Sequence, residues 1–398
     1  MSLYPPACGS SEPPAALPIV QGQPVLGVPV AEQHHAAPTT ARPTAAEAQA
    51  SLPNFPPGIV EALLTSSSEA FPVRFFVVDN SGSMQAGDGN RTILDAQGRG
   101  RLVRATRWEE LADTVMQVGA MALALNARTD FHLLNPRTCG QFFSMGDDAT
   151  AGAIPIAGGR LESLQGLREV ICGTSPAGTT PLTESVMALV SLIEPAAAKL
   201  RARGQQAVVI LATDGMPNDP PSFLAALKTL QALPVWTVVR LCTDDDGVVE
   251  YWNQLDGSLE APLEVLDDHA GEAKECAQKN GWLTYGAAMH LARTFGMVDK
   301  LWDLLDEQAL LPSQVRQFCT LLLSDGSGGG VALPEPELDP RAFVTAVTAA
   351  LQRSDAPPVF DPLSGRMKPW IDTAALARHL SRQVDGVASC MGPDCVVS

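Results

Sequence analysis

The chain has 398 residues and a formal net charge of −17. Its length exceeds that of a typical domain of about 100–200 residues, which predicts one α/β domain with appended segments. The acidic balance argues against nucleic acid or an anionic membrane as the main partner, because phosphate surfaces are bound by clustered Lys and Arg.

The eight cysteines are scattered along the chain, without a Cys-x-x-Cys pair or a His at ligand spacing. This pattern is typical of reduced, mostly buried thiols. No apolar stretch approaches the length of about 20 residues that spans a bilayer, and the N-terminus lacks the basic start and apolar run of a secretory signal. The sequence therefore predicts a cytoplasmic protein without a membrane span.

Residues 1–54 are rich in Pro and Ala, with Tyr4 as their only aromatic residue and no sustained helical or strand period. This composition predicts a mostly disordered arm. Its apolar run at 24–30 would suit an extended segment that docks on a sheet edge or a partner, although a loose arm is the simpler interpretation.

From residue 71 the chain alternates between short β-rich runs and longer helical stretches. This alternation predicts a doubly wound, mostly parallel sheet with helices on both faces, over residues 71–268. The segment 85–104 is long for a connection, and both a functional loop and a plain β-hairpin fit it. The expected strands are 75–78, 131–135, 141–145, 207–213, 235–242 and 263–266, and the expected helices are 107–126, 161–171, 182–203 and 222–232.

After residue 268 the sequence favours helices, broken by Gly281, Gly296 and Pro312. We expect a helical appendage over 269–352 and a C-terminal tail with a short helix over 353–398. Aromatic residues at helical spacing are more often packing than a ligand cage, so we expect five of them to form the core of the appendage: Trp282, Tyr285, Phe295, Trp302 and Phe318.

Three loops carry the residues with metal-binding chemistry. The first, Asp79-Asn80-Ser81-Gly82-Ser83, follows the apolar run 75–78 directly. Ligands of parallel sheets collect outside the carboxyl ends of the strands, and Gly82 permits the tight turn that would bring both hydroxyls to Asp79. Hard oxygen donors without Cys or His suit Mg²⁺, or Mn²⁺, better than zinc or copper.

The second and third loops follow the same logic. The strand-like run 207–213 ends in Asp214-Gly215, which places another carboxylate at a strand end. Between them lies Gly178-Thr179-Thr180-Pro181, a Gly-flanked loop that opens into a helix with Pro at its first turn.

Together, Asp79-x-Ser81-x-Ser83, Thr180-Pro181 and Asp214-Gly215 resemble, in order, the metal-ion-dependent adhesion site of the von Willebrand factor A (VWA) domain. The resemblance implies that Ser81, Ser83 and Thr180 bind the metal directly, with Thr179 as the alternative to Thr180. It implies that Asp79 and Asp214 act largely through bound water. An acidic side chain of a protein partner would complete the octahedron. The implied function is a non-enzymatic, Mg²⁺-dependent binding or scaffolding module, either alone or as a subunit of a larger assembly.

Other interpretations fit parts of the pattern. The loops can be only helix caps and turns. A Mg²⁺-dependent phosphoester hydrolase would use Asp79 as nucleophile. The phosphatase-like pattern requires a second Asp two residues later, and this position is Ser81. A regulatory subunit of an ATPase complex would use the same metal site as the binding module, and only the bound partner would differ. The acidic runs at 244–246, 264–268 and 303–307 are better explained as a solvated face than as a second metal site.

Overall fold

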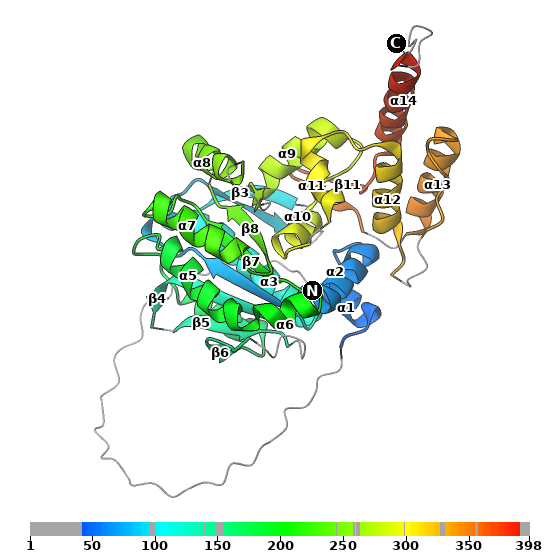
Figure 1. Ribbon diagram of the computed structural model, residues 1–398. Helices are drawn as coiled ribbons and strands as arrows, with labels where there is room; N and C mark the ends of the chain where they lie inside the picture. The colour runs from blue at the N-terminus through cyan, green and yellow to red at the C-terminus, as the bar shows by residue number, and fades with distance from the viewer. Residues whose placement is uncertain are drawn as a thin grey trace, which may run out of the picture.

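The structure is a computed structural model that describes residues 42–94, 100–138, 140–147, 154–243, 245–257, 259, 263–297, 299–326, 331–354 and 357–390. Its centre is a seven-stranded sheet in the order β6-β5-β4-β1-β7-β8-β9 (Figure 1). Neighbouring strands are parallel except for the antiparallel pair β4–β5. The predicted α/β fold with a mostly parallel sheet is therefore confirmed. The strands are β1 (Val73–Val78), β4 (Thr129–Arg137), β5 (Gly140–Met145), β6 (Gly159–Arg160), β7 (Ala207–Thr213), β8 (Val235–Leu241) and β9 (Leu263–Leu266).

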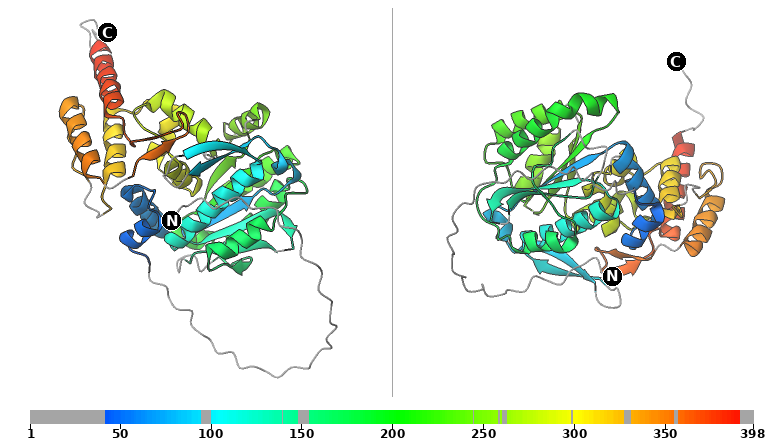
Figure 2. Two further views of the ribbon diagram at one scale, coloured as in Figure 1. Left: turned by 180° about the vertical axis from the view of Figure 1, so that it is seen from behind. Right: turned by 90° about the horizontal axis from the view of Figure 1, so that it is seen from below.

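Helices cover both faces of this sheet, as the two views of Figures 1 and 2 show. Alternate residues of β1 point to opposite faces, so that Phe75 and Val77 belong to one buried cluster and Phe76 and Val78 to the other. The face of Phe75 packs against α5 (Leu182–Ile193), α6 (Ala197–Ala202), α7 (Pro220–Gln231) and α8 (Asp246–Asp256), and the face of Phe76 packs against α3 (Arg107–Ala124) and α4 (Leu164–Cys172).

The helix predicted over 182–203 is divided in the structure. A 3₁₀ turn, η3 (Glu194–Ala196), separates α5 from α6. Pro195 lies in this turn, and Pro cannot donate the backbone hydrogen bond that a continuous α-helix requires. Helix α8 was not predicted, because its acidic start at Asp245 and Asp246 resembles a solvated loop; the Asp245 side chain in fact caps the helix.

The helices after β9 pack on the same side of the sheet as Phe76. The five aromatic residues expected in the appendage core are buried, but they share one continuous cluster with the sheet residues Phe76 and Val208. Gly296 adopts φ +87, and a Cβ at this position would lie 2.6 Å from the Val208 side chain. These elements are α9 (His269–Asn280), α10 (Ala287–Thr294), α11 (Lys300–Glu307), α12 (Pro312–Leu323), α13 (Pro340–Arg353), the hairpin of β10 (Val359–Asp361) and β11 (Arg366–Lys368), and α14 (Thr373–Cys390).

Part of the range 1–54, which was predicted to be a mostly disordered arm, forms a helix. Helix α1 (Ala45–Ser51) lies inside the range 1–54, so the prediction of disorder is wrong there. A capping box explains the helix, since the Thr44 hydroxyl accepts from the Glu47 backbone and the Glu47 side chain accepts from the Thr44 backbone. Helix α2 (Pro57–Glu69) follows and packs beside α12. The arm up to residue 41 lies outside the described residues.

The segment 85–104 contains a β-hairpin rather than a bare loop. A 3₁₀ turn, η1 (Gly82–Gln85), leads into β2 (Gly89–Leu94), which pairs with β3 (Gly100–Ala105) in an antiparallel ladder. This hairpin lies outside the central sheet, and β2 packs along α3.

The cysteine prediction holds for some positions and fails at another. Cys242, Cys276 and Cys319 are free and buried, as expected. Cys172, at the exposed end of α4, is disulfide-bonded, so the prediction of reduced thiols is wrong for this residue. Within the described part of the chain, no helix has both the length and the apolar character needed to cross a bilayer.

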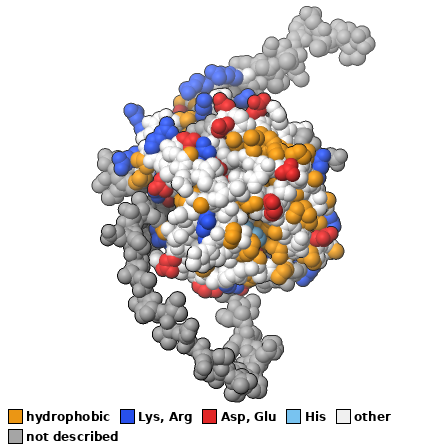
Figure 3. Space-filling model, turned by 90° about the vertical axis from the view of Figure 1, so that its left-hand side faces the viewer, with side chains coloured by type: hydrophobic (Ala, Val, Ile, Leu, Met, Phe, Trp, Pro, Cys, Tyr) orange, Lys and Arg blue, Asp and Glu red, His pale blue; other side chains and the backbone are white. Residues whose placement is uncertain are grey.

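The surface seen from the left-hand side of Figure 1 is mixed in character (Figure 3). Hydrophobic side chains form broad groups on this face, and the acidic side chains between them are scattered. The acidic excess of the chain is therefore not concentrated in one patch on this side.

Candidate metal centre

Asp79 lies at the carboxyl end of β1 and is fully buried. Its backbone N–H donates to Ala212 O at 2.9 Å, which continues the pairing of β1 with β7. Its two carboxylate oxygens accept from different loops: Oδ1 from the Ser81 backbone at 2.8 Å and Oδ2 from the Thr213 hydroxyl at 2.6 Å. Burial raises the pKa of Asp79, and the charge of Asp214 adds to this rise against the lowering effect of the hydrogen bonds.

The two serine hydroxyls connect the first loop to the third. Ser81 Oγ lies 3.0 Å from Ser83 Oγ, and Ser83 Oγ donates to Asp214 Oδ1 at 2.8 Å. Ser81 is buried, whereas Ser83 is exposed at the start of η1. Four of the five predicted residues, Asp79, Ser81, Ser83 and Asp214, therefore form one hydrogen-bonded cluster at the ends of β1 and β7.

The second loop lies against the first through its backbone. Gly82 N donates to Gly178 O at 3.1 Å, and Ala177 N donates to Asn80 O at 2.9 Å. Gly178 adopts φ +97, a conformation that suits glycine. The loop containing Thr180 is thus adjacent to the loop containing Ser81 and Ser83.

The hydroxyl of Thr180 is not joined to the cluster by the hydrogen bonds of the described residues. Its backbone N–H donates to Asn218 Oδ1 at 3.3 Å, and its carbonyl accepts from Asn218 N at 3.4 Å. Thr179 is exposed, and its carbonyl accepts from Asn135 Nδ2 at 2.8 Å. The choice between Thr179 and Thr180 as ligand stays a prediction.

Arg107, the first residue of α3, was missed by the sequence reasoning. Its Nη1 lies 3.0 Å from Asp214 Oδ2, while Nε and Nη2 bind the two carboxylate oxygens of Asp88 at 2.7 and 2.6 Å. The hydrogen bonds with Asp88 are the largest cause of a raised Arg107 pKa, and they lower the pKa of Asp88. The sequence did contain a signal for this residue. A positive charge in the first turn of a helix is disfavoured by the helix dipole, so Arg107 is expected to have an acidic partner.

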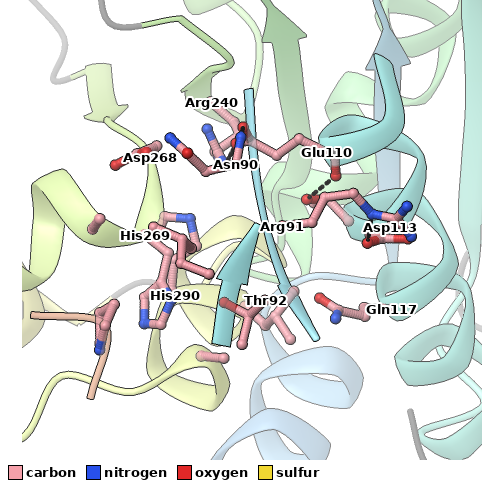
Figure 4. A pocket seen from close by; sticks show the side chains of 16 residues that line it. Asn90, Arg91, Thr92, Glu110, Asp113, Gln117, Arg240, Asp268, His269 and His290 are labelled. Atoms are coloured by element: carbon pink, nitrogen blue, oxygen red, sulfur yellow. Dashed lines mark hydrogen bonds and ion pairs between the residues drawn. The ribbon is translucent and has the colours of Figure 1, made fainter. Parts of the chain in front are cut away.

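Two further ionic contacts hold the hairpin beside α3, one turn apart along the helix (Figure 4). Arg91 on β2 makes a bidentate pair with Asp113, with contacts of 2.6 and 2.7 Å. Glu110 accepts from Asn90 N at 2.9 Å and from Arg240 Nη2 at 2.8 Å, which ties the hairpin to the end of β8. The same helix therefore positions Arg107 and anchors the neighbouring hairpin.

The donor set fits a hard divalent cation. The cluster offers two carboxylates and two hydroxyls, and oxygen-only sets of this kind favour Mg²⁺ or Mn²⁺. The nearby thiol of Cys242 is buried, and its pKa is raised well above the ordinary value by desolvation, so it offers no thiolate ligand or nucleophile. The cluster can therefore hold a metal near an exposed surface, and Cys242 does not compete there as a soft ligand or nucleophile.

Comparisons with known proteins add little to this geometry. No protein-family model matches the chain, and no curated protein matches it. Among solved structures, the chain is similar to the manganese-loaded TRAP protein of Plasmodium vivax, with 15% identity, a TM-score of 0.27, and coverage of 50% of this chain and 69% of that chain. At this TM-score the similarity carries no argument about the site.

Proposed function

We propose that this protein is a non-enzymatic binding or scaffolding module of the VWA type, centred on residues 71–268, in which a bound Mg²⁺ captures an acidic side chain of a protein partner. Asp79, Ser81, Ser83, Thr180 and Asp214 would hold the ion. The observation that carries the proposal is the hydrogen-bonded cluster in which Ser83 bridges the first loop to Asp214 at the edge of the sheet. Mn²⁺ would serve in place of Mg²⁺, because both prefer oxygen ligands.

The exposure of the site supports capture of a large partner. Ser83 is exposed, and Met216, which follows the Asp214-Gly215 turn, has 48% of its surface exposed. A partner carboxylate could therefore reach the metal while apolar surface packs beside it. A metal with open coordination positions and few protein ligands suits such capture.

The geometry disfavours the hydrolase alternative. Asp79 is fully buried, and both of its carboxylate oxygens accept hydrogen bonds from Ser81 and Thr213. A nucleophilic carboxylate must reach the substrate, and this one is enclosed. We therefore assign Asp79 to holding the metal and its bound water rather than to attack on a phosphorus atom.

The first test measures the metal alone. Mn²⁺ binding to the purified chain is followed by electron paramagnetic resonance, with Mg²⁺ as competitor. We expect the Ser83→Ala variant to lose binding, whereas Ser191→Ala, which removes an exposed hydroxyl bonded within its own helix, should bind as the parent does. Equal binding by both variants would contradict the assigned site.

The second test addresses the partner. Tagged protein captures proteins from its native extract in Mg²⁺ and in chelator, and the bound proteins are identified by mass spectrometry. Partners lost both in chelator and with Ser83→Ala, but kept with Ser191→Ala, would support metal-gated capture. Partners retained under all conditions would reject it, and Mg²⁺-dependent turnover of p-nitrophenyl phosphate that Asp79→Asn stops would favour the hydrolase instead.

A further inference from the structure

A small cavity lies near the carboxyl end of β8, where the β2–β3 hairpin and α3 meet the helices that follow β9 (Figure 4). Its volume is about 70 Å³, and polar side chains reach it from β2, α3, β8, α9 and α10. Leu102, which is 44% exposed, also lines it, so the cavity opens to the surface. None of the five residues that we assign to the metal lines this cavity. It is therefore a separate place where a small molecule can enter.

Arg240 supplies unused hydrogen-bond donors to this cavity. The side chain is 3% exposed, and its Nη2 donates to Glu110 Oε1 at 2.8 Å. Its Nε and Nη1 are buried and have no hydrogen-bond partner among the described residues. A guanidinium has five N–H donors, and a buried donor without an acceptor is costly. The cavity therefore requires an acceptor atom beside Arg240.

His290 on α10 lines the same cavity and is 5% exposed. Neither of its ring nitrogens has a hydrogen-bond partner in the part of the chain that the structure describes. Burial lowers the pKa of His290 well below 6.5, and the charge of Arg240 lowers it further, so the ring is neutral. A neutral imidazole has one N–H donor and one acceptor nitrogen. His290 can therefore both donate to an occupant of the cavity and accept from it.

The charges around the cavity select against a charged occupant. Arg240 is paired with Glu110, and Arg91 is paired with Asp113. Asp268, at the start of α9, adds one further carboxylate to the lining. An anion would be repelled by these carboxylates, and a cation would face the unused donors of Arg240. An uncharged molecule avoids both costs.

The unused polar groups define which uncharged molecule fits. The Asp268 Oδ1 accepts from Gly271 N at 2.6 Å, which leaves Oδ2 as an acceptor. The cavity thus offers donors from Arg240, an acceptor from Asp268, and one of each from His290. A primary amide matches this set, because its oxygen accepts, its NH₂ group donates, and it carries no net charge. Leu291 lines the cavity as well and suits an alkyl group on the amide.

We propose that this cavity binds a small uncharged molecule through a primary amide group, whose oxygen accepts from Arg240 and whose NH₂ group donates to His290 and Asp268. A water molecule needs about 10–15 Å³ of such space, so a cavity of about 70 Å³ has room for an amide group with a short alkyl substituent. The remainder of a larger amide would leave through the opening beside Leu102. This proposal does not depend on the function proposed for the metal centre.

The experiment compares acetamide, acetate and acetamidinium, which have the same planar shape and differ in charge and in hydrogen-bond donors. Their binding to the purified full chain is followed by saturation-transfer NMR of the methyl group, in the presence of chelator so that metal has no influence. We expect acetamide to bind in the millimolar range, because a molecule of this size has few contacts. It should bind at least about fivefold more tightly than acetate or acetamidinium, the ratio that one hydrogen bond gives.

Two histidine variants locate the bound amide. His290→Phe keeps a ring in the cavity wall and removes both nitrogens, so it should weaken acetamide binding by about fivefold or more. His132→Phe is the matched control, because it removes another buried imidazole whose Nε2 has no partner among the described residues, and His132 does not line the cavity. Acetamide should bind to this control as it binds to the parent. In the parent labelled with ¹⁵N-histidine, acetamide should shift the ring resonances of His290.

Two cap variants test the choice of an uncharged ligand. Asp268→Ser keeps a capping hydroxyl at the start of α9 and removes the carboxylate from the cavity. The preference for acetamide over acetate should fall by about threefold or more, because the anion is repelled less. Asp219→Ser makes the same change at the exposed cap of α7 and should leave the preference unchanged.

Tighter binding of acetate would assign the cavity to an anion, and tighter binding of acetamidinium would assign it to a cation; either result would overturn the proposal. Failure of all three probes to bind would overturn it as well, because water alone would then fill the cavity. Equal effects of His290→Phe and His132→Phe would reject the assigned position. Mn²⁺ binding at the metal centre is measured separately, so its failure would leave these results unaffected.

Discussion

Arg107 Nη1 lies 3.0 Å from Asp214 Oδ2, so a fixed positive charge contacts one of the two carboxylates that we assign to the metal. The same guanidinium holds Asp88, at the start of the hairpin. The candidate metal centre is therefore coupled electrostatically to the hairpin on α3, and the occupancy of the centre should depend on this arginine.

The variant Arg107→Gln should bind Mg²⁺ more tightly, by about tenfold. Repulsion between a guanidinium and a divalent ion near a protein surface costs on the order of 1–2 kcal/mol, and the variant removes it. Isothermal calorimetry gives the affinity, and Arg101→Gln, an exposed arginine on the same hairpin, is the control. Weaker binding would show that Arg107 supports the centre, and unchanged binding would show that its charge does not compete with the ion.

A second prediction concerns the loop that contains Thr180. Gly178→Ala should destabilise the fold by about 1–3 kcal/mol, because the residue has φ +97 and a Cβ would lie 2.4 Å from Asn135 Oδ1. Gly178 O also accepts a hydrogen bond from Gly82 N in the first loop, so the same variant should bind Mg²⁺ more weakly. Gly215→Ala is the matched control in the same site, because a Cβ there meets no atom within 4 Å. Urea unfolding and Mg²⁺ titration of both variants measure the two effects, and equal behaviour would contradict the role given to Gly178.

The third prediction compares a buried ion pair with an exposed one. Glu110→Ala should cost about 3–5 kcal/mol of unfolding free energy, because it leaves the Arg240 guanidinium buried without its carboxylate. Glu162→Ala removes one of two acidic partners of Arg160 at the surface, where the Glu162 side chain is 78% exposed, and should cost less than about 1 kcal/mol. Chemical denaturation measures both. A small effect of Glu110→Ala would mean that water replaces the lost carboxylate.

The fourth prediction concerns pH. Desolvation lowers the pKa of His132 from its ordinary value of 6.5 to about 4, so the folded state binds fewer protons than the unfolded state between these values. The contribution of His132 to the free energy of unfolding is therefore fully present above pH 6.5 and falls as the pH decreases. The decrease between pH 7 and pH 5 is on the order of 2 kcal/mol for this one group. In His132→Phe this decrease should be smaller by that amount, as measured by denaturation at each pH.

The same comparison contains its own control. Between pH 7 and pH 8 the imidazole is neutral in both states, so the parent and His132→Phe should show the same pH dependence there. The nearby charges of Asp130 and Arg128 act in opposite directions on His132, and desolvation remains the dominant cause of the shift. If the unfolding free energies of the two proteins fall equally between pH 7 and pH 5, the lowered pKa assigned to His132 is contradicted.

The sheet and the proximity of most residues of the candidate site could be predicted because each depends on local rules. An apolar run followed by Asp indicates a buried strand whose end carries a carboxylate, and parallel strands bring such ends together. The positions of Asp79 and Asp214 at neighbouring strand ends were predicted in this way. Helix α1 was missed although its sequence, Thr44-x-x-Glu47, contains a visible capping box.

Other features depend on which elements pack together, and hydrophobic periodicity does not determine that. Arg107 meets Asp88 only because the hairpin returns along α3. Glu264 and Asp306 are more than forty positions apart in the sequence, and their approach requires α9 and α11 to cover the edge strand β9. Interpreting each acidic run by itself favoured a solvated face, whereas the fold joins them around one cavity.

The continuous core beneath the sheet joins its strands to the C-terminal helices. Arg74 in β1 donates through Nε to Phe295 O at 2.8 Å, and its guanidinium lies 4.2 Å above the Phe295 ring. A break in the chain near residue 268 would separate Arg74 from Phe295 and Val208 from the closely packed Gly296. The loops at the carboxyl edge of the sheet therefore rest on a core that the C-terminal helices complete, and we expect residues 71–268 without those helices to lose part of that core.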